Sequence, residues 1–224
     1  MEQTIRLFLV FRTKNMSCQK KVIMVQLLHS VCKGVGLEVV MATLYVLGAM
    51  SFLLFVLYDI NQIKDNRRGL RILFPSGLLL LLVVSIIIGA RAPVTFRYGI
   101  YLSMEFLVLA VAFFVLLIYT LFFAVPFDAA YVQGSKQKLA TGGVYGICRH
   151  PGVLFLAGTY IFLALALGEK ALLLAGIEFT VCNIIYVIIQ DRWIFPIVFD
   201  GYDEYKNSTH FLLPLGHKRS CREE

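Results

Sequence analysis

One short stretch of the sequence carries residue types that suit ligand binding and proton transfer. It reads GGVYGICRHPG, from Gly142 to Gly152, and lies between two strongly apolar runs. Adjacent glycines permit a tight turn or the close approach of a ligand to the backbone, and Pro151 favours the first turn of a helix. His150 titrates near neutral pH. The stretch therefore suits an anion site at a helix N-terminus with a proton-transferring side chain beside it.

A simpler interpretation of the same stretch stays open. Arg149 is also the kind of residue that keeps a loop on the cytoplasmic side of a membrane, and His150 suits an interfacial position. A second polar group has a similar ambiguity. Asn183, Tyr186 and Gln190 are spaced three and four apart in an apolar run, which places them on one face of a helix. They either face a polar ligand or form hydrogen bonds between helices.

Transmembrane helices must position these residues. The 224 residues are 59% hydrophobic and 16% charged, with a mean hydropathy of +0.78, which excludes an ordinary soluble domain. Backbone polar groups in lipid need partners within their own segment, so the apolar runs are expected to be helices. We predict an all-α integral membrane protein with a bundle of about five transmembrane helices. The expected spans are Val39–Tyr58, Ile72–Ala90, Gly99–Phe127, Gly152–Leu167 and Ala171–Ile189.

The connections and charges predict how the helices are arranged. Only Gly168, Glu169 and Lys170 separate the last two spans, so these spans should form an antiparallel hairpin. Residues 37–224 are predicted to form a single membrane-embedded domain, whereas residues 1–36 are an N-terminal segment of uncertain placement. The distribution of Lys and Arg places the turn and the C-terminal tail on the cytoplasmic side. The six Lys and Arg of residues 1–36 conflict with that topology, because five spans would leave this segment outside.

Charge and cysteine content favour no other class of function. The net charge of +7 is explained by positive cytoplasmic loops with some attraction to anionic lipid, and no nucleic-acid patch is indicated. The five cysteines have no CxxC or other paired spacing. Neither a disulfide framework nor a metal site is therefore expected.

Four motifs follow one another in the C-terminal region, residues 136–214. They are TGGVYGICRHP (Thr141–Pro151), QDR (Gln190–Arg192), FDGYDEY (Phe199–Tyr205) and HFLLP (His210–Pro214). This order resembles the isoprenylcysteine carboxyl methyltransferase family and the related phospholipid methyltransferases. In those families a T-x-G-x-Y-x-x-x-R-H-P turn leads into a helical hairpin, an acidic pair and an F…Y-x-x-Y…P segment.

The resemblance implies a small helical membrane bundle in which a cytoplasmic C-terminal tail closes a pocket for S-adenosylmethionine. Carboxylates and aromatic faces would stabilise the sulfonium cation of that cofactor. The acceptor would be a small lipid or a lipidated or hydrophobic molecule that enters from the bilayer and carries a carboxylate, an amine or a thiol. Arg149 and His150 are the catalytic candidates, and His150 would be the base that an amine or thiol acceptor needs. The implied cofactor-binding residues are Gln137, Leu139, Ala140, Gly143, Tyr145, His150, Pro151, Gln190, Asp191 and Tyr202.

Several positions depart from the family pattern. Gln190 replaces one acid of the pair, and Val153 stands where the family usually has Tyr. Apolar and Tyr residues around Ile184–Tyr186 replace a basic residue of the prenylcysteine enzymes, which weighs against a prenylcysteine carboxylate as acceptor. Two alternatives stay open. One is an NADPH-dependent reductase similar to the sterol reductases, which also have an R-H-P turn, and the other is a non-catalytic membrane protein that keeps the fold. The sequence carries no signature of oligomeric state.

Overall fold

The computed structural model describes residues 18–64, 67–91, 95–122, 139 and 141–213, with side chains from residue 36 onward. The chain forms two compact units, residues 1–43 and 44–224. Helix α2 (Cys18–Ile63) begins in the first unit and supplies the first helix of the second. It is continuous through residue 36, where the sequence suggested the end of a separate segment.

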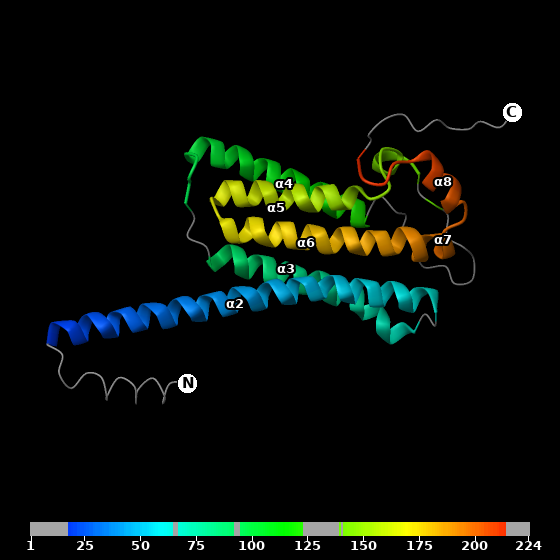
Figure 1. Cartoon of the computed structure of the whole chain (residues 1–224). Helices are drawn as coiled ribbons and strands as arrows, with labels where there is room; N and C mark the ends of the chain where they lie inside the picture. Colours follow the sequence, from blue (N-terminus) through cyan, green and yellow to red (C-terminus); the bar gives the residue numbers. More distant parts are fainter. Residues whose placement is uncertain (1–17, 65–66, 92–94, 123–138, 140, 214–224) are drawn as a thin grey trace. The chain divides into compact units, whose positions relative to one another are not determined.

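Regular structure in the described ranges is helical, which confirms the expected all-α class (Figure 1). Residues 44–224 contain the C-terminal part of α2 and three further long helices, together with several short elements. The long helices are α3 (Leu73–Arg91), α4 (Ile100–Phe122) and α6 (Lys170–Ile189). The shorter ones are η1 (Arg68–Ile72), η2 (Gly143–Gly146), α5 (Pro151–Leu167), the π-helical η3 (Gln190–Ile194), α7 (Phe195–Val198) and α8 (Tyr202–Ser208).

Four described helical segments are long and apolar enough to cross a membrane, which indicates a membrane protein. They are Gly36–Ile63, Arg68–Arg91, Ile100–Phe122 and Lys170–Val198. The remaining expected span corresponds to α5, which has 17 residues. A helix of that length extends about 26 Å, whereas the hydrocarbon core is about 30 Å thick. The described residues therefore give four full-length spans and one shorter apolar helix, and residues 123–127 of the expected third span lie outside them.

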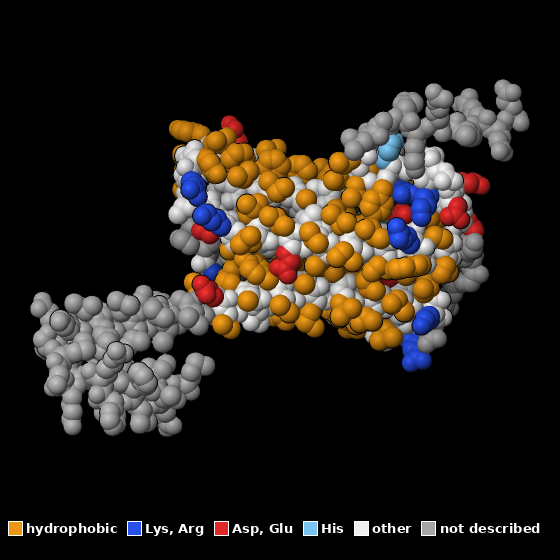
Figure 2. All heavy atoms as spheres, in the orientation of Figure 1, with side chains coloured by type: hydrophobic (Ala, Val, Ile, Leu, Met, Phe, Trp, Pro, Cys, Tyr) orange, Lys and Arg blue, Asp and Glu red, His pale blue; other side chains and the backbone are white. Residues whose placement is uncertain are grey.

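The surface of the bundle is apolar along its length. Figure 2 shows hydrophobic side chains over most of this face, with Lys and Arg gathered near the ends of the helices. Val108 of α4 and Ile177 of α6 are among the exposed aliphatic side chains. A soluble protein seldom exposes so continuous an apolar surface, whereas contact with lipid stabilises one.

Helix α5 packs between α4 and α6 (Figure 1). Two glycines allow the close approach. A Cβ on Gly158 would lie 2.2 Å from the Phe113 ring of α4, and a Cβ on Gly176 of α6 would lie 2.4 Å from Tyr160. Small residues at such contacts let helix backbones pack closely in a membrane, where van der Waals contact drives association. This packing holds the N-terminal end of α5, where the turn joins it.

The predicted hairpin of α5 and α6 is confirmed. Gly168 ends α5 in the left-handed conformation, with φ of 72°, which glycine adopts at little cost. The amide of Thr95, in the connection between α3 and α4, donates to the carbonyl of Leu167 at 3.1 Å. The hairpin therefore places the N-terminal end of α5 beside the C-terminal end of α6.

Helix α6 does not stop at Ile189 but continues through η3 into α7. Pro196 has no N–H, so it cannot bond to the carbonyl of Arg192 four residues earlier. One residue before this proline, the amide of Phe195 bonds to the carbonyl of Gln190, five residues earlier, as in a π-helix. Such π turns often occur at functional sites. Here the turn contains two adjacent polar residues, Gln190 and Asp191.

Candidate functional site

A cavity of about 290 Å³ lies inside residues 44–224, at the end of the bundle where α5 begins and α6 passes into η3. Its volume is near the lower end of the usual range for ligand pockets. The apolar part is lined by Phe52, Phe55, Phe74, Leu78, Leu81, Leu117, Leu121 and Leu156. The polar part is lined by Tyr145, Arg149, His150, Asn183, Tyr186, Gln190, Tyr202 and Tyr205. The cavity is therefore amphiphilic.

The turn before α5 is bonded to the C-terminal tail through the backbone. The amide of Arg149 donates to the carbonyl of His210 at 2.8 Å, and the amide of His150 donates to the carbonyl of Phe211 at 3.2 Å. Cys148 and His210 form an isolated parallel bridge. These bonds satisfy backbone donors at the start of α5. The two side chains that follow Cys148 are thus held by a segment about sixty residues later in the chain.

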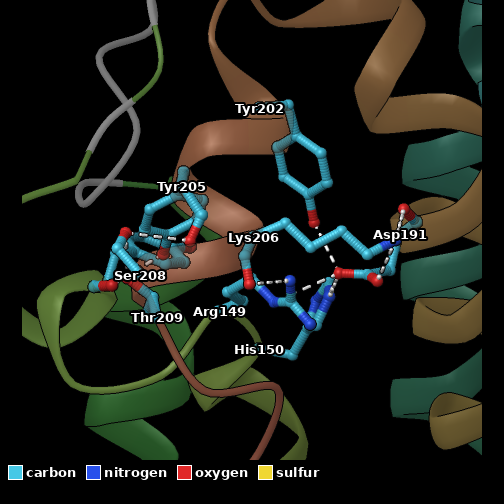
Figure 3. A network of polar contacts seen from close by, with 9 residues as sticks. Arg149, His150, Asp191, Tyr202, Tyr205, Lys206, Ser208 and Thr209 are labelled. Carbon is cyan, nitrogen blue, oxygen red and sulfur yellow. Dashed lines mark hydrogen bonds and ion pairs between the residues drawn. The ribbon is translucent and has the colours of Figure 1, made fainter. Parts of the chain in front are cut away.

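Asp191 is the centre of the polar network drawn in Figure 3. Its Oδ1 accepts a hydrogen bond from the Tyr202 hydroxyl at 2.6 Å, and it lies 3.4 Å from His150 Nε2 and 3.3 Å from Arg149 Nε. Lys206 Nζ lies 3.2 Å from Oδ2. One buried carboxylate thus faces two cations, Arg149 and Lys206.

Arg149 is buried, with 8% of its surface exposed, and its position is fixed on several sides. Besides its pairing with Asp191, Nη1 donates to the carbonyl of Lys206 at 3.1 Å. The guanidinium carbon lies 5.6 Å from the centre of the Phe211 ring, within the range of a cation–π contact. A buried guanidinium that also lines the cavity suits an anionic group of a ligand.

His150 is held in one orientation by two aromatic rings. It stacks on Phe195 at 5.8 Å between ring centres and meets Phe211 edge-on at 5.0 Å. Burial lowers the pKa of the imidazole below its ordinary value, and the contact with Asp191 offsets only part of this effect. The neutral ring donates Nε2–H toward Asp191, which leaves Nδ1 as a proton acceptor.

Three tyrosines of the cavity use their hydroxyl donors within the protein. Tyr145 donates to the carbonyl of Thr120 at 3.0 Å, and Tyr205 donates to the carbonyl of Tyr145 at 2.6 Å. Tyr202 donates to Asp191, as described above. Burial raises the pKa of Tyr145 to about 12 and also raises the pKa values of Tyr202 and Tyr205. The three side chains therefore stay neutral and offer aromatic faces and oxygen lone pairs to the cavity.

A second polar cluster joins α6 to α2. Gln190 Nε2 donates to Asp59 Oδ2 at 2.9 Å and to the hydroxyl of Tyr186 at 2.8 Å. Asp59 is buried, with 7% of its surface exposed. Gln190 and Asp191 are consecutive, yet they bond to different partners, Gln190 toward α2 and Asp191 toward the turn and α8. The predicted face of Asn183, Tyr186 and Gln190 does line the cavity.

The structure brings most of the expected site residues together. The expected residues that line the cavity are Leu139, Tyr145, Arg149, His150, Pro151, Gln190 and Tyr202. Asp191 lies behind this wall, where it holds Arg149, His150 and Tyr202. Gly143 has φ of 60° in η2 and is not part of the lining. Gln137 and Ala140 lie outside the described residues.

The sequence did not indicate two contributors to the site. Asp59 directly follows the expected span Val39–Tyr58, whereas α2 continues to Ile63. Lys206 belongs to none of the four motifs, yet it pairs with Asp191. An acid in the last turns of an apolar helix is a usable signal, because a buried carboxylate needs a partner.

The chain was also compared with models of protein families, with curated proteins and with solved structures, and none matches it.

Proposed function

We propose that this chain is an integral membrane methyltransferase that uses S-adenosylmethionine and acts on a small lipid or a lipidated or hydrophobic acceptor. The proposal combines the motif resemblance to the isoprenylcysteine carboxyl methyltransferases with one observation from the structure. The polar end of the cavity offers two opposite kinds of partner side by side. One is the guanidinium of Arg149, and the other is a wall of tyrosine rings and oxygen lone pairs.

This pair of partners fits the chemistry of the cofactor. S-adenosylmethionine has a carboxylate and a sulfonium cation close together, and it supplies an electrophilic methyl group when it is bound. Arg149 would hold the carboxylate through charge-assisted hydrogen bonds. The rings of Tyr145, Tyr202 and Tyr205 would face the cation. Asp191 would keep Arg149 and His150 in place from behind the wall.

The apolar part of the cavity gives the acceptor a place. Phe52 and Phe55 of α2, with Leu78 of α3 and Leu117 of α4, offer only hydrocarbon and aromatic surface. A chain bound there would direct its head group toward His150. A carboxylate head group needs no base, whereas an amine or thiol would pass its proton to Nδ1 of His150. The protein would then contribute mainly positioning and the exclusion of water.

The test is the binding of S-adenosylmethionine and S-adenosylhomocysteine to the purified protein, measured by calorimetry and thermal unfolding. We expect stabilisation by both compounds, because a ligand that binds only the folded state raises its stability. His150→Ala should weaken binding by about 1–3 kcal/mol, the cost of losing one partner at a buried polar site. Arg149→Lys should also weaken binding, because lysine cannot keep the fixed fork of a buried guanidinium.

His210→Ala is the matched control, because the structure uses the backbone carbonyl of His210 and not its side chain. Its affinity for the cofactor should equal that of the unmodified protein. Unchanged affinity in both His150→Ala and Asp191→Ala would contradict the proposed site. Stabilisation by NADPH alone would favour the reductase, and stabilisation by neither cofactor would favour a non-catalytic protein.

A further inference from the structure

The cluster of Asp59, Tyr186 and Gln190 lies at a part of the cavity that the proposed reaction does not use. It connects α2 to α6 at the level of the π turn. Asp59 itself does not line the cavity, whereas Tyr186 and Gln190 do. The carboxylate therefore acts on the cavity through its neighbours.

The hydrogen bonds fix which way the Gln190 amide points. A side-chain amide has two N–H donors and one carbonyl oxygen. One N–H of Gln190 donates to Asp59 and the other to the Tyr186 hydroxyl, which is itself hydrogen-bonded to Asp59. A carboxylate oxygen accepts only, so a flipped amide would set two oxygens against each other. The nitrogen must therefore face Asp59.

The carbonyl oxygen of Gln190 is then the amide atom that remains for the cavity. Within the part of the chain that the structure describes, no group donates a hydrogen bond to this oxygen. It is also absent from the fully buried polar atoms that lack a partner in those residues, so it keeps some accessible surface. Gln190 lines the cavity, and a carboxylate on another helix sets the direction of its amide.

We infer that Asp59 is a positioning residue that holds the Gln190 carbonyl oxygen toward the cavity. The cavity thereby gains a subsite for an amphiphile with a hydrocarbon chain and a hydroxyl head group. The chain fits against the apolar side chains of α2, α3 and α4, and the hydroxyl donates to Gln190. A bound head group without a donor would cover this acceptor and leave it unpaired, which is how polar sites reject such ligands. The inference does not depend on the methyl donor.

The experiment compares 1-octanol with octyl methyl ether, which differ in the hydroxyl donor. Each probe is added at the same membrane mole fraction to the full chain in lipid nanodiscs, and the shift in thermal unfolding gives its half-saturating level. One hydrogen bond at such a site corresponds to a preference of roughly 2- to 10-fold for the alcohol. Equal stabilisation by the two probes, or no stabilisation by either, would overturn the inference.

Three variants test the role of the carboxylate. Asp59→Asn should reduce the preference toward 1, because the asparagine amide can donate to Gln190 and allow its carbonyl oxygen to turn away. Gln190→Leu should also abolish the preference, even if Asp59→Asn fails to fold. The double variant Asp59→Asn with Gln190→Glu should restore it. In that variant the new amide at position 59 donates to one oxygen of the new carboxylate at position 190 and leaves the other oxygen for the ligand.

Glu178→Gln in α6 is the matched control, since it makes the same kind of change outside the cavity lining. It should keep the preference of the unmodified protein. A purely structural role of Asp59 predicts lower unfolding temperatures but an unchanged ratio between alcohol and ether, and that result would contradict the inference. The octanol and ether measurements are made without S-adenosylmethionine. They therefore test this subsite separately from the binding of the cofactor.

Discussion

Two buried carboxylates lie at the same end of the bundle and have opposite surroundings. Asp191 faces the guanidinium of Arg149, the ammonium of Lys206 and the imidazole of His150. Asp59 faces neutral donors, the amide of Gln190 and the hydroxyl of Tyr186. Both acids are almost fully enclosed, with 5% and 7% of their surfaces exposed. The difference therefore lies in the charge of their partners and not in their depth.

This difference separates two tasks of a buried acid. Asp191 neutralises cations that the site would otherwise have to bury alone, and removing one partner from such a group is costly. Asp59 accepts hydrogen bonds from neutral groups and orients the side-chain amide of Gln190. We therefore expect Asp191 to dominate stability, whereas Asp59 should mainly affect ligand preference. Four measurements can break or sharpen this contrast.

Asp191→Ala should have the largest effect. The change leaves Arg149 and Lys206 without their buried counter-charge, so we expect a loss of about 3–5 kcal/mol in the free energy of unfolding. Thermal and denaturant unfolding in detergent measure it. Asp203→Ala removes an exposed acid of α8 and serves as the control, with an expected change close to zero. A loss below about 1 kcal/mol for Asp191→Ala would show that the cations do not need the carboxylate.

Asp59→Ala should have a smaller effect on the same measurement. It leaves two neutral donors without their acceptor, which costs about 1–3 kcal/mol. Glu178→Ala is the matched control in α6. Equal losses at positions 59 and 191 would remove the distinction between a charged and a neutral environment.

The pH dependence of stability should reveal His150. Burial lowers the pKa of His150 in the folded protein, whereas the unfolded chain titrates near pH 6.5. The unfolded state therefore binds a proton first as the pH falls, so stability is fully present above about pH 6.5 and is lost below it, by at most about 1.4 kcal/mol per pH unit. His150→Gln should flatten this slope below about pH 6.5, and Glu178→Ala should keep it. An unchanged slope in His150→Gln would assign the dependence to another group.

Tyr205→Phe should have the smallest effect. It removes one hydrogen bond, from the hydroxyl to the carbonyl of Tyr145, and should cost about 0.5–1.5 kcal/mol in unfolding free energy. Tyr101→Phe, at a side chain that is 87% exposed, should cost nothing measurable. A loss as large as that of Asp59→Ala would show that the tail contact stabilises the site as strongly as the second acid does.

The helices could be predicted from the sequence because apolar runs and lipid leave few alternatives. The limits of α3 and the hairpin around Gly168 follow directly from such patterns. The continuation of α6 past Ile189 could not be predicted, because hydropathy does not distinguish an α-helical turn from a π turn. Pro196 is a local sign that the helical hydrogen bonding is interrupted. The sequence does not show that the amide of Phe195 would bond to the carbonyl of Gln190.

The grouping of the candidate residues around one cavity was predictable where a motif contains them. Tyr145, His150 and Gln190 do line one cavity, as expected. The partners that fix them were harder to predict, because Asp59 and Lys206 reach the site from distant parts of the chain. Residues that come together only in the folded bundle have no characteristic spacing in the sequence, so a sequence pattern does not identify them.

The bonds between the turn and the tail have a consequence for biosynthesis. The amides of Arg149 and His150 are satisfied by the carbonyls of His210 and Phe211. Both carbonyls are synthesised after the turn and after the whole hairpin of α5 and α6. A chain that stopped before residue 210 would contain Arg149, Asp191 and Lys206, but it would lack the two acceptors that hold the amides at the start of α5.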